Sequence, residues 1–550
     1  MNLPMWWRAI QRIVCSPAAY AIVLVVFWAC AMRNLEAPGL YMDAINPDYL
    51  VARWLNPELQ NMAWVLPGPR LPLLGNLYHG TQTMWIGLLT YGLLGTSVAS
   101  ARITHALFGA VIVMFVCLIL RRTTRRPWLA LVVSAALATD MAFLGSFRTQ
   151  AYIILAGEMW LMAAFYLAIR TAQSDAPRHG LVLLSGVATG LAAYGYFIFL
   201  FFALPVAALA ILGPGRTSAM RRAAWWGAGF AIGMLPYVIG YVLLGVAEGG
   251  WGPFVEWMRR ALAGLKPTDG SPSYLEGMVA AFRNSRLALT GAGNEIMMNG
   301  GASIDSTWAK WRLLFVTLAG LVCLGAGVSN WNSDRRFAKV LLASVGLPMA
   351  FLAIAAWFGS RMWAHHFTSL IAIGYVLVGL AAGWALTRVR NGIPARIAAG
   401  VFVLGAVLWL SGNMVQQNRV HARLAATGGA GLSTDALSVM AREALSERTE
   451  TVWCFPDWGF FMPFVFLTGN QVSYEIEASP AALERHRGSR QQVKLAFWKE
   501  ADREQYETFL RENGVQEVSH RVLTTRDGQP AVHLLVGRLP AMEEDANATE

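Results

Sequence analysis

Charged residues and cysteines are scarce in this sequence, and both shortages restrict what the protein can be. Charged residues make up 14% of the 550 positions and hydrophobic residues 56%, with a mean hydropathy of +0.44. This composition excludes an ordinary soluble globular protein and predicts a polytopic membrane protein. Four of the five cysteines lie within or beside apolar segments, so the sequence indicates no disulfide framework.

Common nucleotide and metal motifs are also missing. The sequence contains no phosphate-binding glycine loop, no His-Glu-x-x-His and no paired-cysteine signature, and its external loops hold no close Asp-x-Asp pair. We therefore expect no nucleotide-driven pump, no cofactor and no metal in the functional site. The net charge of +11 does not indicate nucleic acid, because the arginines cluster in short loops between apolar runs, where they encode membrane orientation.

Apolar runs predict about eleven transmembrane helices with the N-terminus in the cytoplasm and the C-terminus outside, because arginine clusters alternate between them. Met84–Leu94 is too short to span and predicts an interfacial or re-entrant helix. Leu181–Leu212 is too long for one span and predicts two compressed helices that meet near Tyr194–Tyr196. The other predicted spans are Ala18–Met32, Ala101–Leu120, Trp128–Leu144, Ala151–Ile169, Ala223–Val246, Trp311–Val328, Val340–Trp357, His366–Leu386 and Ile397–Leu410.

The composition divides the chain into two domains and a tail. Residues 1–412 are predicted to form the transmembrane domain, with external loops at 33–100 and 247–310, the second of which favours short amphipathic helices. Residues 413–540 are predicted to form a small α/β domain on the outer face, and the acidic tail 541–550 is expected to be disordered. The predicted strands are Thr451–Phe455, Gln471–Ile476, Gln492–Phe497, Glu517–Val522 and Ala531–Val536.

The stretch with the clearest chemical character directly follows the first apolar segment. Residues 39–56 read GLYMDAINPDYLVARWLN and place Asp43 and Asp48 beside aromatic residues and one base, Arg53. Acids this close to a membrane segment lose hydration and are costly without partners, so both are candidate functional groups. Each acid also has a structural interpretation, since an aspartate before a short helix accepts its first amide protons.

The layout resembles the glycosyltransferase C superfamily, within it the branch of protein mannosyltransferases and aminoarabinose transferases. In that branch an acid soon after the first helix precedes a tyrosine, a short helix with Ala and Arg, and proline-rich sequence. The matching residues here are Asp43, Tyr49, Ala52, Arg53 and Pro67–Pro72, followed by Gly95, Thr96, Ser97 and Arg102 at the second span. The similarity covers roughly residues 10–400 by layout, but by individual residues only the first loop and the second span.

This sequence departs from the branch beside its first acid. A second acid often follows the first directly, whereas Ala44 follows Asp43 here and Asn46-Pro47 shifts Asp48 toward that role. Both aspartates therefore stay candidates for the catalytic acid, and Asp43 is preferred.

The resemblance implies a transferase that moves a sugar, with inversion, from a polyprenyl-phosphate donor to a glycan, lipid or protein hydroxyl at the periplasmic face of a bacterial inner membrane. A carboxylate at the membrane boundary can accept the hydroxyl proton, because partial desolvation raises its pKa. The leaving phosphate needs cationic or hydrogen-bonding partners. The candidates are Arg102, Arg148, Arg361, His365 and His366, with Tyr49, Arg53, Glu158 and Arg286 as possible supporting residues and Glu158 as a possible partner of Arg102 or Arg148.

Two alternative activities remain open at this point, as does an inactive scaffold protein. A ligase or polymerase of lipid-linked glycans would place its functional basic residues in the late external loop, where Arg283 and Arg286 stand. A secondary transporter would also have many spans and intramembrane polar residues, but it would be expected to show internal repeats, and none is evident in this sequence.

Overall fold

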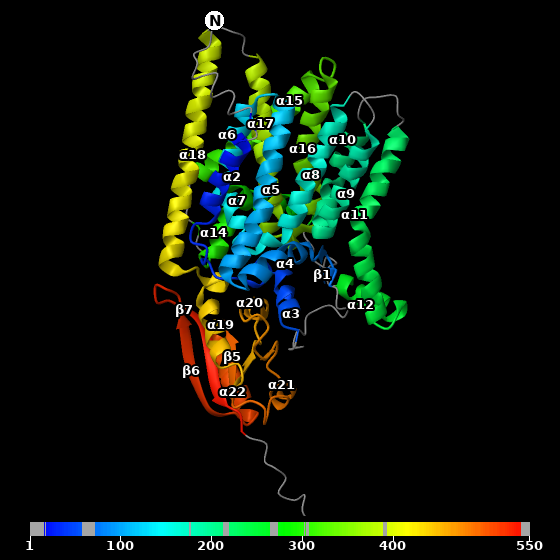
Figure 1. The fold of residues 1–550 in the computed structure, drawn as a ribbon. Helices are drawn as coiled ribbons and strands as arrows, with labels where there is room; N and C mark the ends of the chain where they lie inside the picture. Colours follow the sequence, from blue (N-terminus) through cyan, green and yellow to red (C-terminus); the bar gives the residue numbers. More distant parts are fainter. Residues whose placement is uncertain are drawn as a thin grey trace, which may run out of the picture.

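Long helices run side by side through most of the computed structural model, and a small sheet domain covers one end of them (Figure 1). The structure describes residues 16, 18–57, 72–174, 178–212, 219–263, 273–301, 303, 307–388 and 393–540. The predicted tail and most of the proline run Pro67–Pro72 lie outside these residues.

Among the residues that the structure describes, six helices are long and apolar enough to cross a membrane. They are Val98–Thr124 (α5), Gln150–Ala172 (η3 and α8), Ala219–Ala247 (α11), Thr307–Ser329 (α15), Arg335–Phe358 (α16) and Ala364–Arg388 (η6 and α17). Shorter apolar helices accompany them: α2 (Ala18–Ala31), α6 (Pro127–Ala138), α9 (His179–Gly195), and η4 with α10 (Phe197–Ile211). The protein is therefore a multi-pass helical membrane protein.

Two predicted apolar runs are interrupted in the structure. The run Leu181–Leu212 breaks at Tyr196, between α9 and η4, as the sequence predicts. The run Trp128–Leu144, predicted as one span, divides into α6 and α7 (Met141–Ser146). Asp140 causes this second break, because its carboxylate caps α7 by accepting the Ala142 amide proton at 2.8 Å.

Asp140 also belongs to a buried polar network that joins four helices. Arg312 Nη1 on α15 lies 2.6 Å from Asp140 Oδ1, and both side chains are buried. The Tyr375 hydroxyl on α17 donates to the same carboxylate at 2.8 Å. Arg312 also donates to Asn413 at 3.3 Å, which lies on the last long helix, α18 (Ile393–Thr427). This network connects α7, α15, α17 and α18.

The two external loops form short elements. The first loop contains η1 (Met42–Ala44), η2 (Asp48–Leu50), α3 (Val51–Leu55), β1 (Leu74–Asn76), β2 (His79–Gly80) and α4 (Gln82–Leu94), which has 13 residues. α4 lies at the end of the bundle that faces the sheet domain (Figure 1). The second loop contains the expected short helices: α12 (Trp251–Ala263), α13 (Tyr274–Thr290) and α14 (Ala292–Met298).

The C-terminal domain is a five-stranded sheet with the strand order β4-β3-β5-β7-β6. β3 pairs in parallel with β4 and β5, whereas β7 pairs antiparallel with β5 and β6. All five predicted strands are present. Their bounds are Thr451–Cys454 (β3), Tyr474–Glu475 (β4), Gln492–Phe497 (β5), Gln516–Thr524 (β6) and Pro530–Arg538 (β7), with helices α19 (Ala436–Ser446), α20 (Phe461–Leu467), α21 (Pro480–Glu484) and α22 (Arg503–Glu512). α18 runs through the predicted domain boundary at residue 412 and ends at Thr427.

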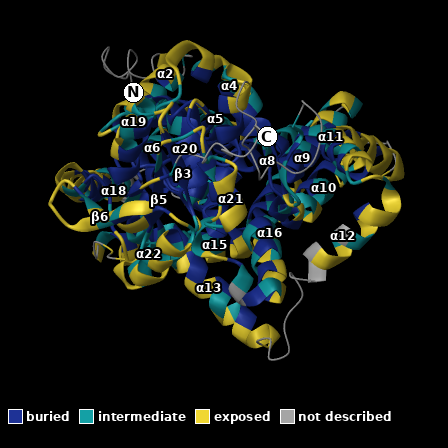
Figure 2. Cartoon of the chain, turned by 90° about the horizontal axis from the view of Figure 1, so that it is seen from below, coloured by how far each residue is buried: buried dark blue, intermediate teal, exposed yellow. Residues whose placement is uncertain are grey.

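The sheet domain shares one hydrophobic core with the first external loop. Tyr49 packs edge-on against Phe461 with ring centroids 6.0 Å apart, and Tyr91 packs against Phe466 with ring centroids 5.2 Å apart. The Asn56 side chain donates to the Gly469 carbonyl at 2.7 Å. Viewed from this end, β3 and α20 are buried near the middle of the molecule (Figure 2). The domain therefore holds the first loop against the helices.

Candidate functional site

Asp48 is sealed inside the protein. Its side chain is fully buried, and Oδ2 accepts hydrogen bonds from the hydroxyls of Tyr91 on α4 and of Tyr152 on η3, the latter at 2.7 Å. Burial raises the pKa of Asp48 to about 6, although the hydroxyl hydrogen bonds act in the opposite direction. This carboxylate joins the loop to two helices, which favours a structural role over the catalytic role considered from the sequence.

Asp43 has a different environment. Its side chain is half-buried, and no hydrogen bond to it is found among the residues that the structure describes. Burial alone raises its pKa to about 6. A carboxylate with this pKa is ionised at neutral pH, and without donors to stabilise its charge it can accept a proton.

Aromatic hydroxyls surround Asp43. Burial is the main cause of the raised pKa of Tyr41, Tyr78 and Tyr196, and the nearby Asp43 charge raises each of them further. The rings of Tyr78 and Tyr196 lie 5.4 Å apart. Asp43 therefore faces a polar aromatic wall formed by the β1–β2 turn and by the break between α9 and η4.

Two adjacent histidines extend this wall. His366 Nε2 lies 3.1 Å from the Tyr196 hydroxyl, and the rings of His365 and His366 are 3.9 Å apart. The Gln150 side-chain amide lies 2.9 Å from His365 Nδ1. We call Asp43, Tyr78, Tyr196, His365 and His366 the Asp43 cluster.

Hydrogen bonds to the protein fix the histidine tautomers. The Trp363 backbone N–H donates to His366 Nδ1 at 3.0 Å, so the proton of neutral His366 is on Nε2 and points to Tyr196. Donation from Gln150 to His365 Nδ1 likewise places the His365 proton on Nε2. The cluster thus offers hydrogen-bond donors beside a carboxylate that can accept a proton.

A close helix crossing positions Tyr196. A Cβ added to Gly195 would lie 2.8 Å from the Gly157 backbone nitrogen, so α8 and α9 touch backbone to backbone at this point. α9 ends directly afterwards, and Tyr196 has an extended backbone with φ −160° and ψ 132°. Two small residues on neighbouring helices therefore determine where the tyrosine stands.

Arg102 and Arg148, predicted to bind phosphate, instead anchor the segment before the acidic loop. Arg102 donates to the carbonyls of Phe147 at 2.9 Å and Pro38 at 3.1 Å. Arg148 donates to four carbonyls between Ala31 and Ala37. Both side chains are buried, and desolvation lowers the pKa of Arg148 to about 10. Because their guanidinium groups are enclosed by protein carbonyls, we do not assign them to a phosphate.

The remaining predicted residues are scattered. Arg361 is half-buried at the end of η5 (Gly359–Arg361), on the same short connection as His365 and His366. Arg53 and Arg286 are exposed, and Tyr49 is buried in the shared core. Glu158 is buried on α8, and it contacts neither Arg102 nor Arg148 among the described interactions, so that suggested pairing is not found.

Sequence reasoning did not assign Tyr78, Gln150 and Tyr196 to the site. The break at Tyr194–Tyr196 in an overlong apolar run was a usable signal, because irregular backbone at membrane depth occurs where it lines a protein-enclosed site. Tyr78 and Gln150 carry no comparable signal, since each is a single polar residue, Tyr78 in the β1–β2 turn and Gln150 at the start of η3.

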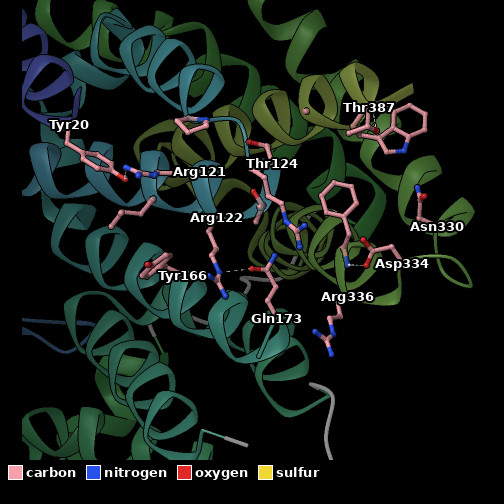
Figure 3. Close-up of a pocket in the computed structure, with 17 residues that line it drawn as sticks. Tyr20, Arg121, Arg122, Thr124, Tyr166, Gln173, Asn330, Asp334, Arg336 and Thr387 are labelled. Carbon is pink, nitrogen blue, oxygen red and sulfur yellow. Dashed lines mark hydrogen bonds between the residues drawn. The ribbon is translucent and has the colours of Figure 1, made fainter. Parts of the chain in front are cut away.

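A separate pocket is lined by residues at the end of α5 that lies away from Arg102 (Figure 3). Its volume is about 770 Å³, and Arg121, Arg122, Arg125 and Arg336 line it together with Asp334. Arg121 follows Arg102 by 19 positions on α5, which is about 28 Å along a helix. This pocket is therefore not part of the Asp43 cluster.

No protein-family model and no curated protein matches the sequence. Among solved structures, the chain is similar to ArnT from Cupriavidus metallidurans bound to undecaprenyl phosphate. The TM-score is 0.52 and the identity 13%, over 96% of this chain and 98% of ArnT. The apo state of the same ArnT gives a TM-score of 0.50 and an identity of 12%, over 97% of this chain and 99% of ArnT.

The chain has the glycosyltransferase C fold. The likeness extends over nearly the whole chain, and it agrees with the fold that the resemblance of the first loop implies. In the glycosyltransferase C fold of this chain, Asp43 lies at the end of the helix bundle that the sheet domain covers.

Proposed function

We propose that the protein is a membrane glycosyltransferase that moves one sugar from a polyprenyl-phosphate donor to an acceptor hydroxyl, with Asp43 as the general base. The observation that carries this proposal is the half-buried Asp43 carboxylate, with its raised pKa, near the hydroxyls of Tyr78 and Tyr196, the second of which contacts His366. The fold shared with ArnT, whose structure holds undecaprenyl phosphate, supports the class of donor.

In the proposed reaction the acceptor hydroxyl gives its proton to Asp43 and its oxygen bonds to the anomeric carbon of the sugar. The bond from that carbon to the phosphate oxygen breaks on the opposite face, which inverts the configuration. Negative charge then builds on the leaving phosphate, and preorganised donors there lower the barrier. We assign this task to Arg361, to the Nε2 proton of His365 and to the Tyr196 hydroxyl.

We also propose about eleven spans, with the N-terminus in the cytoplasm and the sheet domain in the periplasm of a bacterial inner membrane. Arg121, Arg122 and Arg125 support this orientation. They lie at the end of α5 opposite the Asp43 loop, and arginines next to a span favour the cytoplasmic side. A fusion of alkaline phosphatase after residue 540 tests it. The fusion is expected to be active, and an inactive fusion would contradict the orientation.

The deciding experiment is a transfer assay in membranes supplied with labelled polyprenyl-phosphate sugars. Asp43→Asn is expected to abolish transfer, because an amide cannot accept the proton. Glu36→Gln is the matched control, since Glu36 is an exposed acid seven positions earlier in the same loop and should be dispensable. Full transfer by Asp43→Asn would refute the base assignment, and no transfer by the parent from any such donor would favour a transporter.

A further inference from the structure

Three side chains converge on one point at the edge of the C-terminal sheet, far along the chain from the Asp43 loop. His520 on β6 and His533 on β7 are diagonal neighbours on one sheet face, because His533 pairs with Val522 in the antiparallel register. Glu500 comes from η8 (Glu500–Asp502), which follows β5 and Phe497, and Phe497 in turn pairs with His533. We propose that Glu500, His520 and His533 bind a divalent zinc ion.

The distances among the three ligand atoms match such a site. His520 Nε2 lies 3.2 Å from His533 Nδ1 and 3.6 Å from Glu500 Oε2, and His533 Nδ1 lies 2.8 Å from the same carboxylate oxygen. Tetrahedral zinc with bonds of about 2.0–2.1 Å places its ligand atoms roughly 3.3–3.4 Å apart. The three separations fall on both sides of this value, so a single ion reaches all three atoms with small side-chain adjustments.

Hydrogen bonds alone do not pair all three ligand atoms. His533 Nδ1 lies within hydrogen-bond distance of two partners, His520 Nε2 and Glu500 Oε2, but it can donate to only one of them. The 3.6 Å separation of His520 Nε2 from Glu500 Oε2 is too long for a hydrogen bond. A cation at the centre satisfies the lone pairs of all three atoms together. Imidazole and carboxylate are common zinc ligands, and three protein ligands leave a fourth position for water.

Neighbouring side chains hold the ligands in place. The ring of Phe497 stacks on His533 with centroids 5.4 Å apart, and the two histidine rings are parallel within 3°. Arg503 Nη1 lies 3.3 Å from Glu500 Oε1, which leaves Oε2 for the metal. Such second contacts orient ligands in metal sites. His533 is buried and Glu500 is exposed, so an ion enters from the Glu500 side.

A bound zinc ion would restrain the segment of the sheet domain that packs against the loop containing Asp43. Trp498 lies two positions before Glu500 and stacks on Phe460 with ring centroids 4.0 Å apart. A Cβ added to the adjacent Gly459 would lie 3.3 Å from the Tyr41 ring, two positions before Asp43. The zinc site itself does not depend on the proposed transferase activity.

Isothermal titration of the tag-free full chain in detergent, after stripping with chelator, tests the site. One equivalent of zinc is expected to bind with micromolar affinity or tighter, and cobalt in its place should give the visible absorption of a tetrahedral nitrogen and oxygen site. Glu500→Ala and His520→Ala are expected to weaken zinc binding by more than the roughly 10–100-fold that loss of an outer partner costs.

The matched control is His486→Asn. His486 lies in the same domain, and its Nε2 is 2.8 Å from Glu475 Oε1. The described part of the chain holds no candidate metal-ligand group that includes His486, so zinc binding should not change. Because Glu500 is exposed, Glu500→Ala should leave the fold intact, and its thermal midpoint without metal verifies this. No stoichiometric binding by the parent, or equal binding by the parent and Glu500→Ala, would overturn the proposal.

Discussion

The hydroxyl oxygen of Tyr196 lies 3.1 Å from Nε2 of His366, and the histidine is the donor in this contact. The donor is fixed because the Trp363 backbone N–H already occupies Nδ1. Tyr196 therefore accepts from His366 and keeps its own proton for another acceptor. The nearby Asp43 carboxylate or a donor phosphate can take that proton in a hydrogen bond.

Tyr196→Phe is expected to slow transfer on the order of 100-fold, as loss of a preorganised donor typically does. The ring is retained, so KM and stability should change little while kcat falls. The measurement is the kcat and KM of labelled sugar transfer. Tyr194→Phe is the control, because its hydroxyl donates to the Leu73 carbonyl at 2.8 Å and not to a residue of the Asp43 cluster. Equal losses in kcat for both variants would contradict a specific role of Tyr196.

Transfer should also depend on pH through Asp43. Its pKa is raised to about 6 by burial, and the base acts in its deprotonated form. We therefore expect kcat/KM to fall as the pH drops below about 6 and to be level above it. An unperturbed histidine would titrate in the same range, so the profile is repeated with His365→Asn. An inflection that disappears in this variant would assign it to His365 and contradict the role of Asp43.

Asp48 should affect stability more than chemistry. Its pKa rises from 3.8 to about 6 on folding, so the folded state holds the extra proton between these values and the parent loses stability as the pH rises through this window. The full effect is on the order of 3 kcal/mol. The asparagine of Asp48→Asn does not titrate. The thermal midpoint of this variant should therefore rise relative to that of the parent as the pH increases from 4 to 7. A constant difference would show that Asp48 does not titrate on folding.

Regular elements were predictable because each has a periodic pattern. The five strands of the sheet domain and the break at Tyr196 follow from alternation and from run length. The interruption at Asp140 was missed, because one acid in an apolar run does not reveal the buried arginine, 172 positions later, that compensates for it.

Site residues were harder to predict because their partners are distant in sequence. Asp43 and the histidine pair were both candidates. Of the two residues that join them, Tyr196 is marked only by the break in its apolar run, and Tyr78 has no pattern that separates it from other tyrosines. The position of an arginine at a helix end was not enough to predict a phosphate ligand. Arg102 and Arg148 lie at helix ends, as phosphate ligands would, but they donate to backbone carbonyls. Every residue has a backbone carbonyl, so the sequence does not reveal these partners.

The buried pair of Asp140 and Arg312 should be essential for stability but not for transfer. Asp140→Asn leaves the Arg312 charge in the core without its 2.6 Å partner, and breaking such a pair costs about 3–5 kcal/mol. The exposed pair Arg259 and Glu256, 3.1 Å apart on α12, supplies the control, because Arg259→Gln should cost less than about 1 kcal/mol.

Thermal unfolding in detergent measures both losses in stability, and transfer per folded molecule should stay near that of the parent. If the cost comes from an unpaired charge, adding Arg312→Gln to Asp140→Asn should recover part of the stability. Additive losses in the double variant would instead show that the two residues act independently, through Tyr375 and Asn413 rather than through each other.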